Sequence, residues 1–263
     1  MPARIITLTT DFSLRDPYAA EMKAVILSIC PSAVIVDVTH EVEKFNIRMG
    51  AYMLASAISN FPHGTVHVAV VDPGVGTKRR PIIVQTATGF FVGPDNGLLV
   101  LAAEAQGVKR IYEITSRRLM LSHISSTFHG RDIFAPAAAH LANGVPLEEF
   151  GPEISEMVRP LFAEVTRKED TLVGEVLHVD SFGNITTNIH AKNIGGIRGR
   201  MLQVELPHNK LELKLSKTYA EAKPQEPIAL IGSHDYLEIA VNQGNAAAKY
   251  QTKPGDKITL LMS

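Results

Sequence analysis

The stretch IITLTTDFSLRDPYAAEMKAVILSICPSAVIVDV, residues 5–38, predicts a strand, a helix and a second strand in succession. Ile5–Thr9 is an apolar run typical of a strand, and Asp16 and Pro17 then suit the N-cap and first turn of a helix. The helix carries apolar side chains at helical spacing, namely Met22, Val25, Ile26 and Ile29. The second strand, Ala33–Val38, is almost continuously apolar, which predicts that it is covered on both faces.

The same alternation of strand and helix patterns continues through the first 160 residues. The expected elements are a helix at Ile47–Phe61, a strand at Thr65–Val71, a hairpin of Ile82–Gln85 with Phe90–Val92, and a helix at Arg131–Ala142. Such alternation is typical of a mainly parallel sheet with helices on both faces. Residues 1–160 are therefore expected to form an α/β domain.

The pattern changes after Gly151, and residues 152–171 are mixed and charged, as expected of a linker. From Leu172 onward, short apolar runs between turn residues predict strands at Glu175–Val179, Ile185–Ile189, Met201–Leu206, Leu211–Leu215, Pro227–Ile231, Tyr236–Ala240 and Lys257–Met262. No amphipathic helix is apparent among them. Residues 161–263 are therefore expected to form a smaller all-β, barrel-like domain.

The composition favours a small-molecule partner. The chain has 263 residues, 45% of them apolar, and 26 basic against 27 acidic residues give a formal charge of −1. Nucleic-acid and membrane-surface proteins usually carry basic runs, and the densest basic cluster here is only Lys78–Arg80. Cys30 is the single cysteine, which excludes an internal disulfide. Without a leader pattern or an apolar run of roughly 20 residues, the sequence favours a cytoplasmic protein.

Several motifs that bind phosphate, dinucleotides or zinc are missing from the sequence. It has neither a G-x-x-x-x-G-K-[ST] loop nor a G-x-G-x-x-G after the first strand. It also lacks cysteine-rich zinc spacing, H-E-x-x-H and a G-x-S-x-G nucleophile elbow. The sequence therefore predicts a small polar ligand held by loops, with no cofactor and no metal.

Polar residues at predicted strand ends are candidates for the site, because ligands of open parallel sheets bind beyond the carboxyl ends of the strands. Asp11 follows the first strand and either binds both hydroxyls of a ribose diol or caps a backbone turn. Asp72 follows a buried strand, where a charge must be paired or catalytic. Arg79 is its natural counter-charge, with Lys78 and Arg80 as competitors.

Further polar segments have both a structural and a functional interpretation. His129 lies between an aromatic residue and a glycine, which suits a site, although a lone histidine is more often structural. The loops Asp180–Asn184 and Ile231–Glu238 join predicted strands, and a hairpin turn is the simpler interpretation of the first. Pro94–Gly97 is interpreted as an ordinary turn.

Seven stretches, taken together, resemble the S-adenosylmethionine (SAM) hydroxide adenosyltransferases, relatives of the bacterial fluorinase and chlorinase. They follow the family's order from residue 9 to residue 246 and read TTDFSLRDPYAAEMK, VDVTHEVEKFNIRMGA, GTVHVAVVDPGVGTKRRP, GPDNGLL, STFHGRDIFAPAAAHLA, VDSFGNITTNI and IGSHDYLEIAVNQGNA. No single stretch is decisive, whereas the series covers nearly the whole chain and is highly specific.

The resemblance implies how the water and the ribose are handled. The family's Asp-Arg-His set for the attacking water corresponds to Asp72, Arg79 and His129. Its ribose-binding aspartate corresponds to Asp11. The implied reaction is hydrolysis of SAM to adenosine and methionine, by attack of water on the ribose C5′ carbon.

The resemblance also implies binding residues in the second domain. The loop that begins at Asp180 matches the part that holds adenosine, chiefly through Asn184. Ser233 and Glu238 match positions near the methionine end, and Val241 matches a backbone contact. The family arrangement further implies a homotrimer with sites between subunits.

At the same places the halogenases differ from this chain. Asp72 and His129 stand where the fluorinase has tyrosines, Gly130 replaces a serine that helps to hold fluoride, and Phe45 corresponds to a tryptophan. His234 stands where the fluorinase has an arginine beside the methionine site.

Three alternative functions remain open at this point. A chlorinase-like halogenase is disfavoured, because a halide pocket is expected to avoid a carboxylate such as Asp72. A metal-dependent phosphohydrolase would use Asp11, Asp72 and His129 as ligands. A non-catalytic protein would bind adenosine or SAM without turnover.

Overall fold

The computed structural model describes residues 4–195 and 201–261. The chain forms two compact units, Met1–Arg159 and Pro160–Ser263. Each unit has a hydrophobic core of its own.

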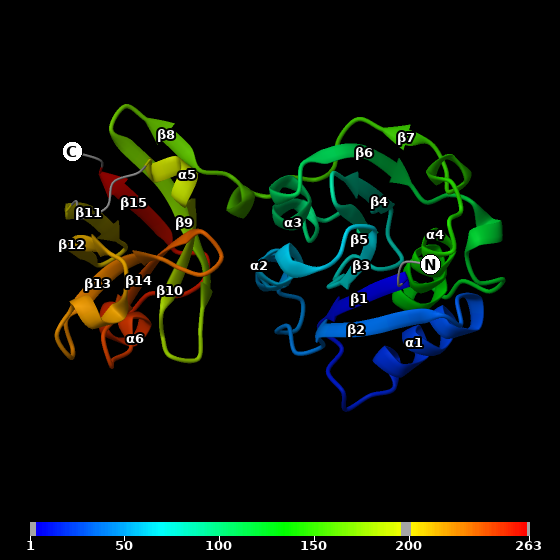
Figure 1. Ribbon diagram of the computed structural model, residues 1–263, viewed down its shortest axis with the longest axis horizontal. Helices are drawn as coiled ribbons and strands as arrows, with labels where there is room; N and C mark the ends of the chain where they lie inside the picture. Colours follow the sequence, from blue (N-terminus) through cyan, green and yellow to red (C-terminus); the bar gives the residue numbers. More distant parts are fainter. Residues whose placement is uncertain (1–3, 196–200, 262–263) are drawn as a thin grey trace. The chain divides into compact units, whose positions relative to one another are not determined.

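A seven-stranded sheet with the strand order β2-β1-β3-β5-β4-β6-β7 forms the centre of the first unit (Figure 1). Its strands are β1 (Arg4–Thr10), β2 (Ala33–Thr39), β3 (Thr65–Val70), β4 (Pro81–Thr86), β5 (Gly89–Pro94), β6 (Val108–Glu113) and β7 (Glu153–Ile154). β2, β1, β3 and β5 run parallel, whereas β4, β6 and β7 pair antiparallel with their neighbours. The prediction of an α/β fold with a mainly parallel sheet is confirmed.

Helices cover both faces of this sheet. They are α1 (Tyr18–Ile29), α2 (Ile47–Ala57), α3 (Val100–Ala105) and α4 (Ala135–Ala142), with shorter helical turns at Ile58–Asn60, Arg117–Leu119, Gly130–Phe134 and Leu147–Glu149. Leu8 and Val68 share one core with α1 and α4. Ala69 and Val71 share the opposite core with α2 and α3. This division follows because successive side chains of a strand point to opposite faces.

Two local predictions in the first strand–helix–strand segment are wrong. α1 begins at Tyr18, Pro17 occupies the N-cap position without a side-chain hydrogen bond, and Asp16 is exposed. β2 is not covered on both faces, since Val34 is 50% exposed. The strand lies at the edge of the sheet, so its apolar run remains partly open to solvent.

The sequence analysis missed several short elements of the first unit. Neither α3 nor β6 was expected, and β7 lies in the stretch assigned to the linker. α3 has only six residues, too few for a clear helical period, and β6 begins with three residues that are exposed or partly exposed, so it has no apolar run at its start. The last predicted helix begins as a single π-helical turn at Gly130–Phe134 and continues as α4.

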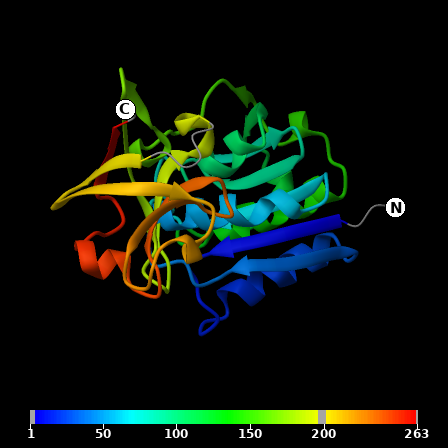
Figure 2. The ribbon, with the colours of Figure 1, turned by 60° about the vertical axis from the view of Figure 1, so that its left-hand side comes forward.

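The second unit is a closed barrel with one additional strand (Figure 2). Its strands are β8 (Thr166–Lys168), β9 (Thr171–Val179), β10 (Ile185–His190), β11 (Met201–Leu206), β12 (Asn209–Ser216), β13 (Pro227–Ile231), β14 (Tyr236–Val241) and β15 (Lys257–Leu261). Pairing of β10 with β9 closes the ring β10-β14-β13-β12-β11-β15-β9 and leaves β8 outside it. The predicted barrel-like domain is confirmed.

The predicted strand segments of this unit correspond to β9–β15 in order. Met262, the last residue of the final predicted strand, lies outside the described residues. The unit also contains two short helices, α5 (Ala191–Ile194) and α6 (Ala246–Tyr250), and helical turns at Leu161–Ala163 and Tyr219–Glu221. The helices are only four and five residues long, which explains why no amphipathic pattern predicted them.

Candidate active site

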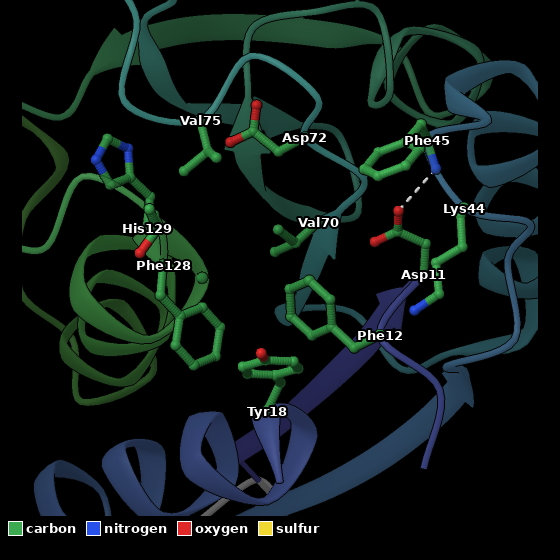
Figure 3. A pocket seen from close by; sticks show the side chains of 12 residues that line it. Asp11, Phe12, Tyr18, Lys44, Phe45, Val70, Asp72, Val75, Phe128 and His129 are labelled. Atoms are coloured by element: carbon green, nitrogen blue, oxygen red, sulfur yellow. Dashed lines mark hydrogen bonds between the residues drawn. The ribbon is translucent and has the colours of Figure 1, made fainter. Parts of the chain in front are cut away.

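A cavity of about 330 Å³ lies beyond the carboxyl ends of β1 and β3 in the first unit. It is lined by Asp11, Phe12, Tyr18, Lys44, Phe45, Val70, Asp72, Val75, Thr127, Phe128, His129 and Gly130 (Figure 3). The structure therefore brings Asp11 and Asp72 to one cavity, as the strand-end argument predicted, and His129, which precedes a helical turn, lies there as well.

Asp72 and Arg79 form an ion pair at this cavity. Arg79 Nε donates to Asp72 Oδ1 at 3.0 Å and to Oδ2 at 2.9 Å, and Nη2 also donates to Oδ2. The two side chains are only 5% and 9% exposed, so water and salt screen the pair little. Lys78, by contrast, is exposed, and Arg79 is the counter-charge of Asp72.

Arg80, the other candidate for the counter-charge of Asp72, instead forms an ion pair with Asp95. Its Nε and Nη2 donate to Asp95 Oδ2 at 2.9 and 2.6 Å. The next residue, Asn96, donates from Nδ2 to the carbonyl oxygen of Val71 at 2.9 Å. The turn that the sequence analysis took as ordinary thus fixes the backbone directly before Asp72. The dipeptide Asp95-Asn96 in the sequence gave no signal beyond a turn.

The loop of residues 73–79 requires a glycine where it approaches the loop that precedes His129. Gly76 has a φ of +76°, and a Cβ there would lie 2.3 Å from the carbonyl oxygen of Ser126. Any other residue at this position would push the two loops apart. Gly76 therefore allows Arg79 and His129 to come into contact.

His129 accepts a hydrogen bond from Arg79. Nη2 of Arg79 lies 2.8 Å from Nδ1 of His129. A guanidinium can only donate, so Nδ1 is the acceptor and the neutral ring carries its proton on Nε2. Burial lowers the pKa of His129, and the charge of Arg79 lowers it further, which favours the neutral ring. In this arrangement neither ring nitrogen is free to accept a proton.

Arg79 has one more donor than its protein partners use. Its Nη1 is buried and has no hydrogen-bond partner among residues 4–195 and 201–261. The guanidinium carbon lies 5.2 Å from the ring centre of Phe134, which covers part of the group. Arg79 itself is not among the residues that line the cavity, and its two partners Asp72 and His129 are.

Asp11 accepts a hydrogen bond from a backbone N–H, and the ribose-diol interpretation of this residue stays a prediction. It is 7% exposed, and its Oδ2 accepts a hydrogen bond from the backbone N–H of Phe45 at 2.9 Å. Phe45 has a φ of +65°, which is unfavourable for a bulky residue, and its side chain is 68% exposed. The other carboxylate oxygen of Asp11 points toward the middle of the cavity (Figure 3).

Three aromatic rings form an apolar wall of the cavity. The ring centres of Phe12, Tyr18 and Phe128 lie 5.2–5.8 Å apart in edge-to-face pairs. Figure 3 shows them on the side away from Asp72. The cavity thus has a charged end and an apolar end.

The sequence analysis overlooked Asp132, which lies three residues after His129 and is fully buried. Its Oδ2 accepts hydrogen bonds from the backbone N–H and hydroxyl of Ser125 at 2.8 and 2.7 Å. A carboxylate next to Ile133 and Phe134 in a helix pattern was the available signal, because a buried charge needs partners.

A separate cavity of about 690 Å³ lies within the second unit. It is lined by Asp180, Phe182, Asn184, Tyr219, Val241, Asn242, Gln243, Gly244 and Asn245. Three predicted binding residues, Asp180, Asn184 and Val241, are among them. Phe182 is 76% exposed, so an aromatic ring stands open to solvent at this cavity.

Asp180 organises the loop that borders this second cavity. Its Oδ1 accepts from the backbone N–H groups of Phe182 and Asn184, both at 2.9 Å, and its Oδ2 accepts from Asn184 Nδ2 at 2.9 Å. The side-chain nitrogen of Asn184 thus donates to Asp180, and Oδ1 of Asn184 can act as a hydrogen-bond acceptor. Gly183 has a φ of +85°, and a Cβ there would lie 2.1 Å from the side chain of Asn245.

The two predicted methionine-end residues lie elsewhere on the barrel. Ser233 is exposed in the turn between β13 and β14. Glu238 accepts a hydrogen bond from the hydroxyl of Tyr219 at 2.6 Å, and burial raises the pKa of Glu238. Neither Ser233 nor Glu238 is among the described residues that line the second cavity, whereas Tyr219 is.

Within the described parts of the chain, no group of three or more His, Cys, Asp or Glu side chains is arranged to hold a metal ion. Of the helices described, none is long and apolar enough to cross a membrane.

Comparison with known proteins identifies relatives along nearly the whole chain. Residues 6–151 match the SAM hydroxide adenosyltransferase N-terminal domain, and residues 174–259 match the C-terminal domain of the same family. The chain is 40% identical over 260 residues to the (R)-S-adenosyl-L-methionine hydrolase of Salinispora tropica, covering 98% of this chain and 97% of the relative. It is 32% identical over 292 residues to the fluorinase of Actinopolyspora mzabensis, covering 98% and 97%.

A solved structure agrees with this relationship. The crystal structure of an uncharacterized conserved protein from Thermotoga maritima is 39% identical and superposes with a TM-score of 0.87, covering 98% of this chain and 99% of that one. The matched domains, the site geometry and the relatives lead to one conclusion: the chain belongs to the SAM hydroxide adenosyltransferase family.

Proposed function

We propose that the protein hydrolyses SAM to adenosine and methionine by attack of water on the ribose C5′ carbon. The observation that carries the proposal is the ion pair of Asp72, which lines the first-unit cavity, with the buried side chain of Arg79, whose Nη1 has no hydrogen-bond partner among the described residues. The proposal is supported by the (R)-S-adenosyl-L-methionine hydrolases among the relatives, which are more similar to this chain than the fluorinases are.

The reaction needs help mainly at the nucleophile. The sulfonium departs as a neutral thioether that takes the electron pair of the broken C5′–S bond, so no general acid is required. Water is a poor nucleophile at neutral pH, and a positioned base raises its reactivity. Asp72 takes up the water proton as the new C5′–O bond forms, and Arg79 stabilises the developing hydroxide character. His129 holds Arg79 through Nδ1, which leaves Asp72 as the proton acceptor.

The product assay tests the function directly. The purified protein is incubated with each sulfonium epimer of SAM, and the products are separated. We expect equal amounts of adenosine and methionine, formed faster from the (R) epimer, for which the relatives are named. Excess chelator should leave the rate unchanged. Absence of turnover with adenosine still bound would instead identify a non-catalytic binding protein.

A halide arm of the same assay addresses the halogenase alternative, which the distant fluorinase relatives raise. Asp72 places a carboxylate at the cavity, and a carboxylate repels the halide ion that would have to occupy it. With chloride or fluoride added, we expect adenosine and no 5′-halo-5′-deoxyadenosine. Accumulation of the halogenated nucleoside would overturn the assignment.

We further propose that Asp11 recognises the ribose diol. Asp11→Ala should weaken adenosine binding at least about tenfold, because each lost hydrogen bond to a carboxylate is worth ~1.5–3 kcal/mol. Methionine binding should change little, and Asp16→Ala, at an exposed carboxylate of the same loop, is the matched control. Calorimetry measures the affinities. Equal affinity of the wild-type protein for adenosine and 2′-deoxyadenosine would remove the diol interpretation.

We also propose that each site combines the first unit of one chain with the second unit of a neighbour in a homotrimer. The two cavities support this division, because one carries the candidate water-handling residues and the other a candidate base-binding loop. Asn184 Oδ1 suits the exocyclic amine of adenine, since its Nδ2 is engaged by Asp180. Ser233, Glu238 and the backbone of Val241 are assigned to the remaining substrate contacts.

A further inference from the structure

Asp132 is a buried carboxylate for which the proposed reaction has no direct use. It is 0% exposed and is not among the residues that line the first-unit cavity. Besides its two bonds from Ser125, it accepts from Arg131 Nε at 2.7 Å through Oδ1. Burying a charge is costly unless it is paired and hydrogen-bonded, and here both oxygens are engaged.

The bonds of Asp132 close the loop that carries His129. The hydroxyl of Ser125 donates to Asp132 and accepts from the backbone N–H of Phe128 at 3.0 Å. The carbonyl oxygen of Phe128 in turn accepts from the backbone N–H of Asp132 at 3.1 Å. Arg131, held by Asp132, lies with its guanidinium carbon 5.0 Å from the ring centre of Phe128. His129 therefore lies in the loop of residues 125–132, which is held closed by hydrogen bonds to the carboxylate and the backbone N–H of Asp132.

The position of this loop decides how the His129 ring meets Arg79. The ring must present Nδ1 to Nη2 of Arg79, 2.8 Å away. Burial has the largest effect on the pKa of His129 and lowers it, and the charge of Arg79 lowers it further. Asp72, Asp132 and a backbone hydrogen bond of Ser125 act in the opposite direction. A small displacement of the loop would break the Nδ1 bond and release Arg79 from its second partner.

We propose that Asp132 is a positioning residue of the hydrolytic site, which acts through Ser125 to hold His129 on Arg79 and thereby Arg79 on Asp72. Its chain of contacts runs from Asp132 to Ser125, to the His129 loop, and on to the ion pair. This inference rests on the proposed function, whereas the tautomer of the His129 ring can be measured without turnover.

Asp132→Asn is the main test. The asparagine amide has to face either Ser125 or Arg131, both of which are donors, so one of the two anchors is lost. We expect kcat for SAM hydrolysis to fall about 10- to 100-fold with KM little changed, because misplacement by about 1 Å carries such a cost. Ser125→Ala, which removes only the hydroxyl bonds, should give a smaller loss of kcat in the same direction.

Glu21→Gln is the matched control. Glu21 accepts from Arg131 Nη1 at 2.8 Å, so this variant disturbs the same arginine without touching Ser125. We expect wild-type kcat for it. A loss of kcat equal to that of Asp132→Asn would mean that Arg131 matters and that the link through Ser125 does not.

Two further readouts separate positioning from general stability. In a His129→Ala background, Asp132→Asn should cause little additional loss of kcat, because both changes break one chain of contacts. If the kcat losses of the two single variants multiply in the double variant, the two residues act independently and the proposal is overturned. In the ¹⁵N histidine spectrum, assigned by comparison with His129→Ala, wild-type His129 should show a single Nε2–H tautomer, and Asp132→Asn a mixture of both. An unchanged single tautomer in Asp132→Asn would overturn it even if the protein proved not to hydrolyse SAM.

Discussion

Replacing Asp72 by asparagine is expected to lower kcat for SAM hydrolysis by about 100- to 10,000-fold. The amide is nearly the same size as the carboxylate but cannot take up a proton from water. It also weakens the charge-assisted bonds to Arg79, whose Nε lies 3.0 and 2.9 Å from the two oxygens. Adenosine affinity should stay close to the wild-type value, because the proposed diol contact is made by Asp11.

The chain offers a close control for this variant in the neighbouring arginine–aspartate pair. Asp95 is 5% exposed and accepts two hydrogen bonds from Arg80 on one oxygen, yet it is not among the residues that line the cavity. Asp95→Asn should lower the melting temperature and leave kcat nearly unchanged. Initial rates and calorimetric adenosine titrations on both variants provide the comparison. A wild-type rate in Asp72→Asn would show that Asp72 is not the base.

Mixing two inactive variants is expected to restore activity if sites are shared between chains. One variant, Asp72→Ala, has a damaged first unit, and the other, Asn184→Ala, a damaged second unit. After the subunits are dissociated and reassembled at equal amounts, random pairing gives about one site in four with both halves intact. Activity should therefore return from a negligible level to about a quarter of the wild-type rate.

A mixture of Asp72→Ala with Arg79→Ala, which both damage the water-handling residues, is the control for this experiment. Both changes lie in the first unit, so reassembly creates no intact first unit and activity should stay low. Subunit exchange is verified separately with differently tagged chains and mass spectrometry. If exchange is complete and the first mixture stays inactive, each site belongs to a single chain and the shared-site proposal fails.

Strand-end reasoning from the sequence found the main residues of the first-unit cavity because parallel strands deliver their following residues to one edge. Asp11 and Asp72 come together for that reason. Sequence position alone could not choose among Lys78, Arg79 and Arg80, since the choice depends on how the intervening loop turns. Gly76, packed against the Ser126 carbonyl, directs that loop in three dimensions.

Other features depended on neighbours that no local pattern reveals. The apolar run of β2 predicted cover on both faces, but its position at the sheet edge leaves Val34 half exposed. Asp132 looked like one more charge in a helix, and only its contacts with Ser125 and Arg131 reveal its burial and its partners. The seven barrel strands were easier to predict, because alternating inward and outward residues and short turns are local properties.

If Asp11 binds the ribose as proposed, its carboxylate links loop order to ligand affinity. One oxygen holds the backbone N–H of Phe45, and the other points into the cavity, so a ligand and the Phe45 loop share one charged group. Linkage then requires reciprocity: if the loop arrangement at Phe45 alters affinity for a ligand by some factor, that ligand shifts the loop equilibrium by the same factor. The left-handed backbone of Phe45 makes this loop arrangement unfavourable on its own, and the hydrogen bond to Asp11 stabilises it. Substitution of Phe45 by glycine would remove this backbone penalty together with a ring that lines the cavity.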